Sequence, residues 1–166
     1  MSKTETFVFS KIPATAEELR SFAEADLQSP FRTAALTMIA LCAYKENRES
    51  ALEMLNFLKG PEPLSAYEKQ FLQDRLSGKE YKPYSFFKGA SPANGYTPDF
   101  PYELEVSDNP YSYPEENWAT LYVKSSGADS VRPVKFRKKP STGQWFLNDI
   151  QCLSDIRVPA AADPWA

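Results

Sequence analysis

The sequence predicts an α+β fold, with four N-terminal helices packed on a C-terminal antiparallel sheet arranged as a meander. Apolar residues recur at helical spacing over about residues 12–78, and over about residues 79–159 they alternate with polar residues, as in strands. Helices followed by strands are typical of α+β domains, in which the helices cover one face of the sheet. The chain has 166 residues, of which 42% are hydrophobic, which suits one globular domain. We therefore expect a single domain over residues 1–159 and a flexible tail over residues 160–166.

The first two helices are marked by their capping residues. Thr15 and Glu18 have the spacing of a capping box, which predicts a helix from there to about residue 28. Ser29 followed by Pro30 supplies a cap and a first-turn proline for a second helix, over about residues 31–45. This second segment is apolar on nearly every side, so we expect it in the middle of the core.

The next two helices have equally clear limits. Leucines at three- and four-residue spacing predict a third helix over about residues 48–59, which Gly60 ends. Ser65 and Glu68 form a second capping box and open a fourth helix, which Gly78 ends. Together the four helices predict one layer.

The second half of the chain predicts loops and strands. Prolines and aromatic residues are dense after residue 80, and short alternating segments follow them. Turn-forming residues at 125–130 and 140–143 join neighbouring antiparallel strands. The pattern predicts a three- or four-stranded meander built from residues 102–106, 119–124, 134–137 and 144–148.

The residue types present exclude several kinds of chemistry. The chain contains no histidine, which removes histidine-based triads, histidine-containing zinc sites and proximal-histidine haem. It has two cysteines, too few for a four-thiolate metal site or a disulfide framework. Cys42 lies in an apolar run, where we expect a buried, reduced thiol. We predict no catalytic residue, no metal site and no cofactor.

Charge and hydropathy limit the partners. A net charge of −3 gives no general attraction to nucleic acid or to an anionic membrane. The first residues lack the pattern of a secretory signal, and no apolar run is long enough to span a bilayer. We expect a cytoplasmic protein that does not contact a membrane.

One segment, the hairpin at residues 131–149, concentrates positive charge. Its cations and a nearby indole are candidates for contact with an anion or a partner, since stacking combined with positive charge is how single nucleic-acid strands are bound. A structural interpretation competes with this one. If the strand with Glu103 and Glu105 lies beside the strand with Lys135 and Arg137, opposite charges pair within the sheet and no partner is needed. The candidate residues are Arg132, Lys135, Arg137, Lys138, Lys139 and Trp145.

The aromatic loops are a second candidate. Rings with a few polar groups can line a ligand pocket or an interface, and long loops in compact domains are often functional. The alternative is that the rings attach the loops to the core. The candidate residues are Tyr84, Phe86, Tyr96, Tyr111, Tyr113 and Trp118.

Several strings together resemble a known family. NPYSY, KSSGADS, RPVKFRKK and STGQWFL are the most specific, and the similarity runs from about Ile12 to Pro159. The chain resembles a family of bacterial proteins, mainly from Clostridia and related Firmicutes, described as a domain of unknown function. The resemblance implies a single soluble domain and supplies no activity, cofactor or catalytic residue.

The leading hypothesis for function is a non-catalytic binding or protein-interaction module of a bacterial cytoplasmic protein, with another protein as its partner. Catalysis would have to be built without histidine, and no other catalytic constellation can be recognised. Two alternatives stay open. One is a small-ligand-binding or enzymatic domain with a pocket between the helices and the aromatic loops. The other, which we rank last, is nucleic-acid binding through the basic hairpin at residues 131–145.

Overall fold

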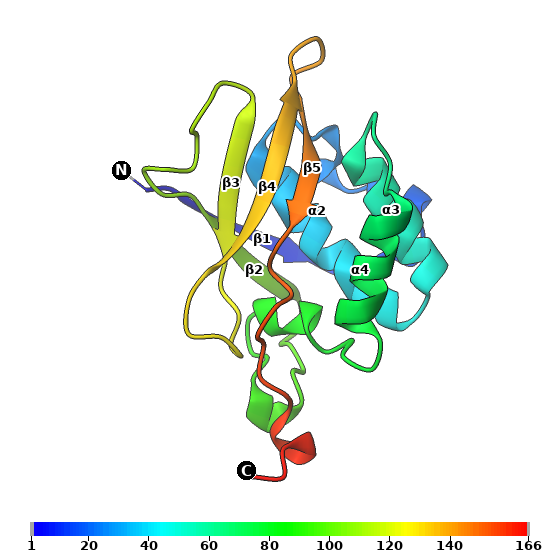
Figure 1. Cartoon of the computed structure of the whole chain (residues 1–166), viewed down its shortest axis with the longest axis vertical. Helices are drawn as coiled ribbons and strands as arrows, with labels where there is room; N and C mark the ends of the chain where they lie inside the picture. Colours follow the sequence, from blue (N-terminus) through cyan, green and yellow to red (C-terminus); the bar gives the residue numbers. More distant parts are fainter. Residues whose placement is uncertain (1, 166) are drawn as a thin grey trace.

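Strands from both ends of the chain form one antiparallel sheet in the computed structural model, which describes residues 2–165 (Figure 1). The helices and strands are β1 (Thr4–Phe9), α1 (Ala16–Arg20), α2 (Pro30–Cys42), α3 (Arg48–Lys59), α4 (Ala66–Leu76), β2 (Tyr102–Ser107), β3 (Trp118–Val123), β4 (Arg132–Lys139) and β5 (Gln144–Ile150). Short 3₁₀ turns lie at η1 (Ala23–Asp26), η2 (Ala43–Lys45), η3 (Pro83–Phe86), η4 (Pro92–Asn94) and η5 (Ala160–Ala162). The predicted α+β fold, with helices mostly in the first half, is confirmed.

The sheet has five strands in the order β1-β2-β3-β4-β5, one more than the largest number predicted. The extra strand is β1, at the N-terminus, which pairs with β2 from Thr4 opposite Ser107 to Phe9 opposite Tyr102. The prediction that the second half alone builds the sheet is therefore wrong. The segment TETFVF has the alternation of a strand, but its partner lies in the other half of the chain.

The predicted pairing of opposite charges across neighbouring strands is also wrong. Glu103 and Glu105 lie on β2, whereas Lys135 and Arg137 lie on β4, and β3 separates the two strands. Consecutive antiparallel strands usually lie side by side, and β3 comes between β2 and β4 in the chain. The cations of β4 are therefore not neutralised by the carboxylates of β2.

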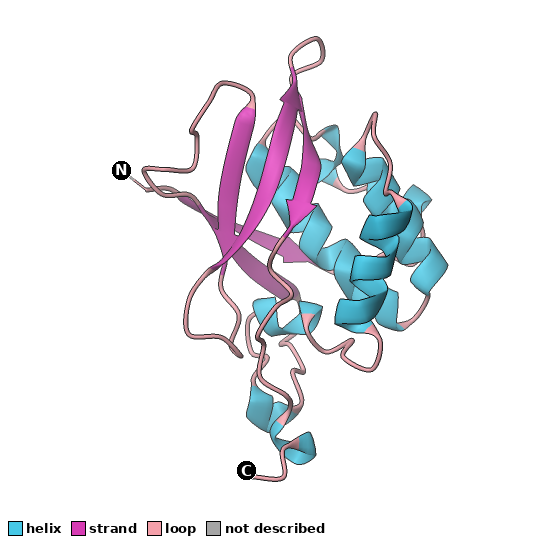
Figure 2. Ribbon diagram, viewed as in Figure 1, coloured by secondary structure: helices cyan, strands magenta, loops and turns pink. Residues whose placement is uncertain are grey.

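The sheet bends sharply between β2 and β3. Only Val106 with Val123 and Ser107 with Tyr122 pair across this boundary, after which the two strands diverge. Figure 2 shows the ribbon of β1 and β2 crossing behind that of β3, β4 and β5. The bend gives the sheet a concave side, against which α2 packs.

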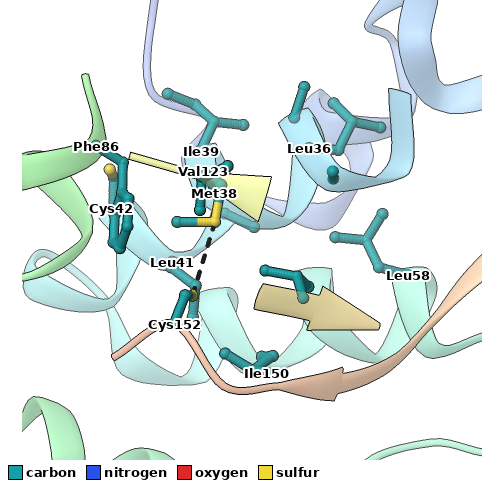
Figure 3. Packing of buried hydrophobic residues seen from close by; sticks show 14 of the residues in the cluster. Leu36, Met38, Ile39, Leu41, Cys42, Leu58, Phe86, Val123, Ile150 and Cys152 are labelled. Atoms are coloured by element: carbon teal, nitrogen blue, oxygen red, sulfur yellow. Dashed lines mark hydrogen bonds between the residues drawn. The ribbon is translucent and has the colours of Figure 1, made fainter. Parts of the chain in front are cut away.

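Helix α2 forms the centre of the core, as its sequence predicts. It contacts β2, β3 and β5 on one side and α3 on the other. Figure 3 shows Met38 of α2 directed toward Cys152, with the two sulfur atoms 4.0 Å apart. Leu36, Ile39 and Leu41 are fully buried around them. A helix surrounded by protein has no need of a polar face, which explains why this segment is apolar all round.

The first helix is shorter than predicted. A single helix to residue 28 was expected, but α1 ends at Arg20 and η1 follows it. Phe22 adopts an extended conformation with a ψ of 147°, and its ring stacks on Phe9 of β1 with the centroids 5.6 Å apart. The helix therefore stops because Phe22 turns toward the strand that the prediction omitted.

The other helix limits agree closely with prediction. The second helix becomes α2 followed by η2, α3 has the predicted bounds, and α4 begins after a complete capping box at Ser65 and Glu68. The Ser65 hydroxyl accepts from the Glu68 amide at 3.1 Å, and the Glu68 carboxylate accepts from the Ser65 amide at 3.1 Å. Local capping chemistry fixes these ends without help from the sheet.

Candidate functional site

The end of α3 and the β4–β5 hairpin enclose a hollow of about 260 Å³. Its walls combine four cations, one carboxylate and apolar side chains. We call it the basic hollow, and the residues that matter here are Lys59, Glu62, Arg137, Lys138, Lys139 and Phe146. Three of the six residues predicted for the hairpin, at positions 137 to 139, therefore line one concave surface.

Backbone conformation brings α3 against the hairpin. Gly60, which ends α3, has a φ of +71°. Residues with a Cβ rarely adopt this backbone conformation. The ring of Phe146 on β5 lies directly against Gly60 and leaves no room there for a Cβ. This close approach forms the apolar wall of the hollow and places Lys59 beside β5.

Lys59 is the one cation of the basic hollow that is neutralised. Its Nζ lies 2.7 Å from Oε2 of Glu68 and donates to the carbonyl oxygen of Asn148 at 3.2 Å. Burial by itself would raise the pKa of Glu68, but the hydrogen bond and charge of Lys59, with the Ser65 amide, outweigh it and lower that pKa below its usual value. Lys59 therefore ties α3 and α4 to the edge of the sheet.

The other three cations of the hollow have no such partner. Among residues 2–165, no carboxylate lies within 4.0 Å of the charged nitrogens of Arg137, Lys138 or Lys139. The guanidinium of Arg137 lies 5.2 Å from the ring centre of Trp118, and Nζ of Lys138 lies 5.9 Å from that of Trp145. Cation–π contacts of this kind orient a cation without neutralising it.

Two predicted hairpin residues lie elsewhere. Arg132, at the opposite end of β4, donates from Nη2 to the carbonyl oxygen of Asp155 at 3.2 Å. Lys135 lies in mid-strand on the exposed side of the sheet, opposite Thr120 and Asp149. Neither residue lines the basic hollow.

Three of the predicted aromatic residues are used inside the fold. Phe86 and Tyr96 are buried, and the Tyr96 hydroxyl donates to the carbonyl oxygen of Arg157 at 2.6 Å. The Tyr84 hydroxyl donates to the carbonyl oxygen of Cys42 at 3.1 Å, and burial raises the pKa of its phenol. These rings attach the loops to the core.

The remaining aromatic candidates lie toward the solvent. Tyr111 is 84% exposed and Tyr113 is 49% exposed, both in the loop between β2 and β3. The Tyr113 hydroxyl donates to Oδ2 of Asp108 at 3.3 Å, and burial together with the charge of Asp108 raises its pKa to about 12. Trp118 is half-buried beneath Arg137. The predicted aromatic residues thus do not form one site.

The sequence of the chain also matches a known protein family. Residues 11–160 match the family model described as Domain of unknown function (DUF6935). The chain belongs to the DUF6935 family. The matched range contains the whole basic hollow. No curated protein and no solved structure matches the chain of this DUF6935 protein.

Along residues 2–165 of the DUF6935 protein, no three or more Cys, Asp or Glu side chains gather where they could hold a metal ion. Within the same residues, every helix is too short or too polar to cross a bilayer.

Sequence reasoning missed Lys59 and Glu62 of the DUF6935 domain. Both lie where α3 ends, far from the hairpin in the chain, and each looks like an ordinary surface charge beside a helix terminus. No local signal links them to β4. Only the packing of Gly60 on Phe146 brings them into the site.

Proposed function

We propose that this domain is a non-catalytic binding module of a bacterial cytoplasmic protein, and that it binds an acidic segment of a partner protein at the basic hollow. One observation carries the proposal: Arg137, Lys138 and Lys139 all line a single hollow and have no carboxylate partner among residues 2–165. Unpaired cations on a concave surface raise the local concentration of anionic partners.

The composition of the hollow favours a protein segment as the ligand. Phe146, Leu147 and Pro140 give it apolar walls beside the cations. An acidic segment can place carboxylates on the cations and an apolar side chain against Phe146, and such a central apolar anchor often carries much of the binding energy.

Nucleic acid fits this surface less well. Proteins that bind phosphate backbones usually carry positive charge over a whole face. Here Glu62 lines the hollow, Glu103 and Glu105 lie on the sheet, and the chain has a net charge of −3. A long polyanion would meet these carboxylates.

Other features support the rest of the proposal. Cys42 and Cys152 are buried and unpaired, which suits a reducing compartment such as the cytoplasm. The bacterial part of the proposal rests on the resemblance of the sequence strings described above, NPYSY and RPVKFRKK among them. We also propose that residues 1–159 form one domain and residues 160–166 a flexible tail; the family match over residues 11–160, which spans most of the proposed domain, supports a single domain.

Binding of a labelled decaglutamate peptide, followed by fluorescence anisotropy, tests the proposal. We expect saturable binding that weakens as salt increases, with a change in tryptophan emission because Trp118 and Trp145 lie beneath the cations. Replacing Arg137, Lys138 and Lys139 together by alanine should weaken binding by about tenfold or more.

A matched variant controls for net charge. Replacing Lys69, Arg75 and Lys79 by alanine removes the same charges from an exposed region at α4, away from the hollow, and should leave affinity within about twofold. Equal weakening by both variants, or no binding at low salt, would refute the proposed site. Tighter binding of an oligodeoxythymidylate than of the peptide would replace the acidic protein segment with nucleic acid.

A further inference from the structure

The two edge strands of the sheet, β5 and β1, differ in whether their outward-pointing backbone groups are hydrogen-bonded. At β5 both backbone groups of Trp145 that point outward have partners: the Trp145 amide donates to the carbonyl oxygen of Leu27 at 2.7 Å, and the Trp145 carbonyl accepts from Oγ1 of Thr33 at 2.7 Å. Lys59 donates to a further carbonyl of this strand, that of Asn148. The β5 edge is therefore covered by side chains and by the segment before α2.

At β1 the outward groups can be identified from the pairing with β2. The Asp108 amide donates to the carbonyl oxygen of Lys3 at 2.9 Å, which makes Lys3 and Asp108 a hydrogen-bonded pair. Hydrogen-bonded pairs alternate along antiparallel strands, so the amides and carbonyls of Thr4, Thr6 and Val8 point away from β2. The hydrogen bond from the Lys88 amide to the Glu103 carbonyl, which also points away from β1, agrees with this alternation.

Among residues 2–165, no hydrogen bond engages the backbone amide or carbonyl of Thr4, Thr6 or Val8. Their side chains are exposed, and Val8 is 53% exposed. The strand has no proline and its pairing with β2 has no bulge, two devices that commonly protect sheet edges.

We propose that the β1 edge pairs with the β1 edge of a second copy of this chain, so that two sheets join across a two-fold axis at Thr6. In this antiparallel register Thr6 faces Thr6, and Thr4 faces Val8 of the other copy. All three are β-branched, which favours cross-strand packing. The three pairs supply about six backbone hydrogen bonds.

The charges on β1 favour this register, and they favour a second copy of the chain as the partner of the β1 edge. With the axis at Thr6, Glu5 faces Phe7 of the other copy, whereas an axis one residue earlier would set Glu5 against Glu5. Glu105 is the neighbour of Thr6 on β2, so the Glu105 side chains of the two copies would lie three strand spacings apart, about 14 Å. That distance exceeds the screening length at physiological salt. The strand is thus complementary to itself.

Sedimentation equilibrium of the full chain, from about 1 μM to 1 mM, tests the proposal because interfaces of this small size are weak. We expect reversible dimerisation in the wild type. Thr6→Lys and Thr6→Glu each place like charges opposite each other at the axis, so each variant alone should stay monomeric over this range. An equimolar mixture of the two variants should dimerise again, since Lys then faces Glu.

Val158→Lys adds the same charge at an exposed valine outside the sheet and should dimerise like the wild type. Circular dichroism checks that every variant is folded. A wild type that stays monomeric up to 1 mM, or a dimer that both Thr6 variants leave unchanged, would overturn the proposal. Failure of the mixture to recover the dimer would overturn the register. None of these outcomes depends on the basic hollow.

Discussion

Lys59 carries a charge in a place with little access to water, since its side chain is only 9% exposed. A buried ion costs free energy unless it is paired and hydrogen-bonded, and Lys59 meets this need with Glu68 and the Asn148 carbonyl. The pair joins α3, α4 and β5 at the base of the basic hollow. A single residue therefore supports both the packing and the shape of the site.

Replacing Lys59 by methionine should destabilise the protein by about 1–3 kcal/mol at neutral pH, because Glu68 is left half-buried without its partner. The folded-state pKa of Glu68 lies below its unfolded value. The pair therefore contributes stability above the unfolded pKa, and this contribution is lost as pH falls through the folded pKa. The difference between variant and wild type should shrink on acidification, as measured by urea unfolding at several pH values.

Lys11→Met provides the comparison for this prediction. Lys11 pairs with Glu18 at 2.8 Å, but its side chain is 54% exposed, so removing it should change stability less than removing Lys59. A Lys59→Met penalty that is the same at acidic and neutral pH would show that the ion pair is not its source.

At the scale of elements, the cover over β5 depends on α2. The hydroxyl of Thr33 is buried and donates to the outward carbonyl of Trp145, a role usually filled by another strand. The side chain of Thr33 thus occupies a position where a further strand would pair with β5. Within residues 2–165, the edge of the sheet with unpaired backbone groups is therefore β1.

Thr33→Val should cost about 1–3 kcal/mol, because the Trp145 carbonyl loses its donor while the shape of the side chain is kept. Hydrogen exchange of the Trp145 amide should also become faster. Thr37→Val is the matched control: its hydroxyl donates at 2.8 Å to the carbonyl of Thr33, which belongs to the backbone ladder of α2, so the loss should be smaller. Equal losses for the two variants would argue against a special role for the β5 edge.

The elements themselves differ in how far sequence predicts them. Helix α4 was predictable because Ser65 and Glu68 satisfy each other locally. Strand β1 was not, because its alternation becomes meaningful only beside β2, whose residues are distant in the chain. The early end of α1 follows from the same omission, since Phe22 turns to stack on Phe9 of β1.

At the scale of the whole molecule, two buried cysteines can be used as chemical probes of whether the core is closed or open. Cys42 lies on α2 and Cys152 follows β5, and both are buried. Burial raises the pKa of the Cys152 thiol to about 12 and raises that of Cys42 as well. At neutral pH both thiols are protonated and inaccessible, so they are chemically inert in the folded state.

We expect both thiols to react at once with an aromatic disulfide reagent in concentrated guanidinium, and to react only slowly in the native protein, where the core must first open. Under native conditions both should be labelled at one common rate, because exposing either requires the core around α2 to open. Mass spectrometry of the labelled protein distinguishes the two sites. Rapid labelling of one cysteine with circular dichroism unchanged would contradict this expectation.

The candidate site could be predicted only in part. The positive charges of Arg137, Lys138 and Lys139 are visible in the sequence. The competing interpretation, in which Arg137 and Lys135 pair with Glu103 and Glu105, was wrong because β3 separates β2 from β4. The concave shape was not predictable. It depends on Phe146 lying against Gly60, a contact between residues that no local pattern connects.

The pairing of β1 with β2 also bears on biosynthesis. Thr4 and Ser107, whose hydroxyl groups lie 3.0 Å apart, are 103 positions apart in the chain. A growing polypeptide therefore releases β1 from the ribosome long before its partner is translated, while the intervening helices can already form through local contacts. Throughout that interval the backbone groups on both edges of β1 are unpaired, so the strand is open to pairing with other chains until β2 has been made.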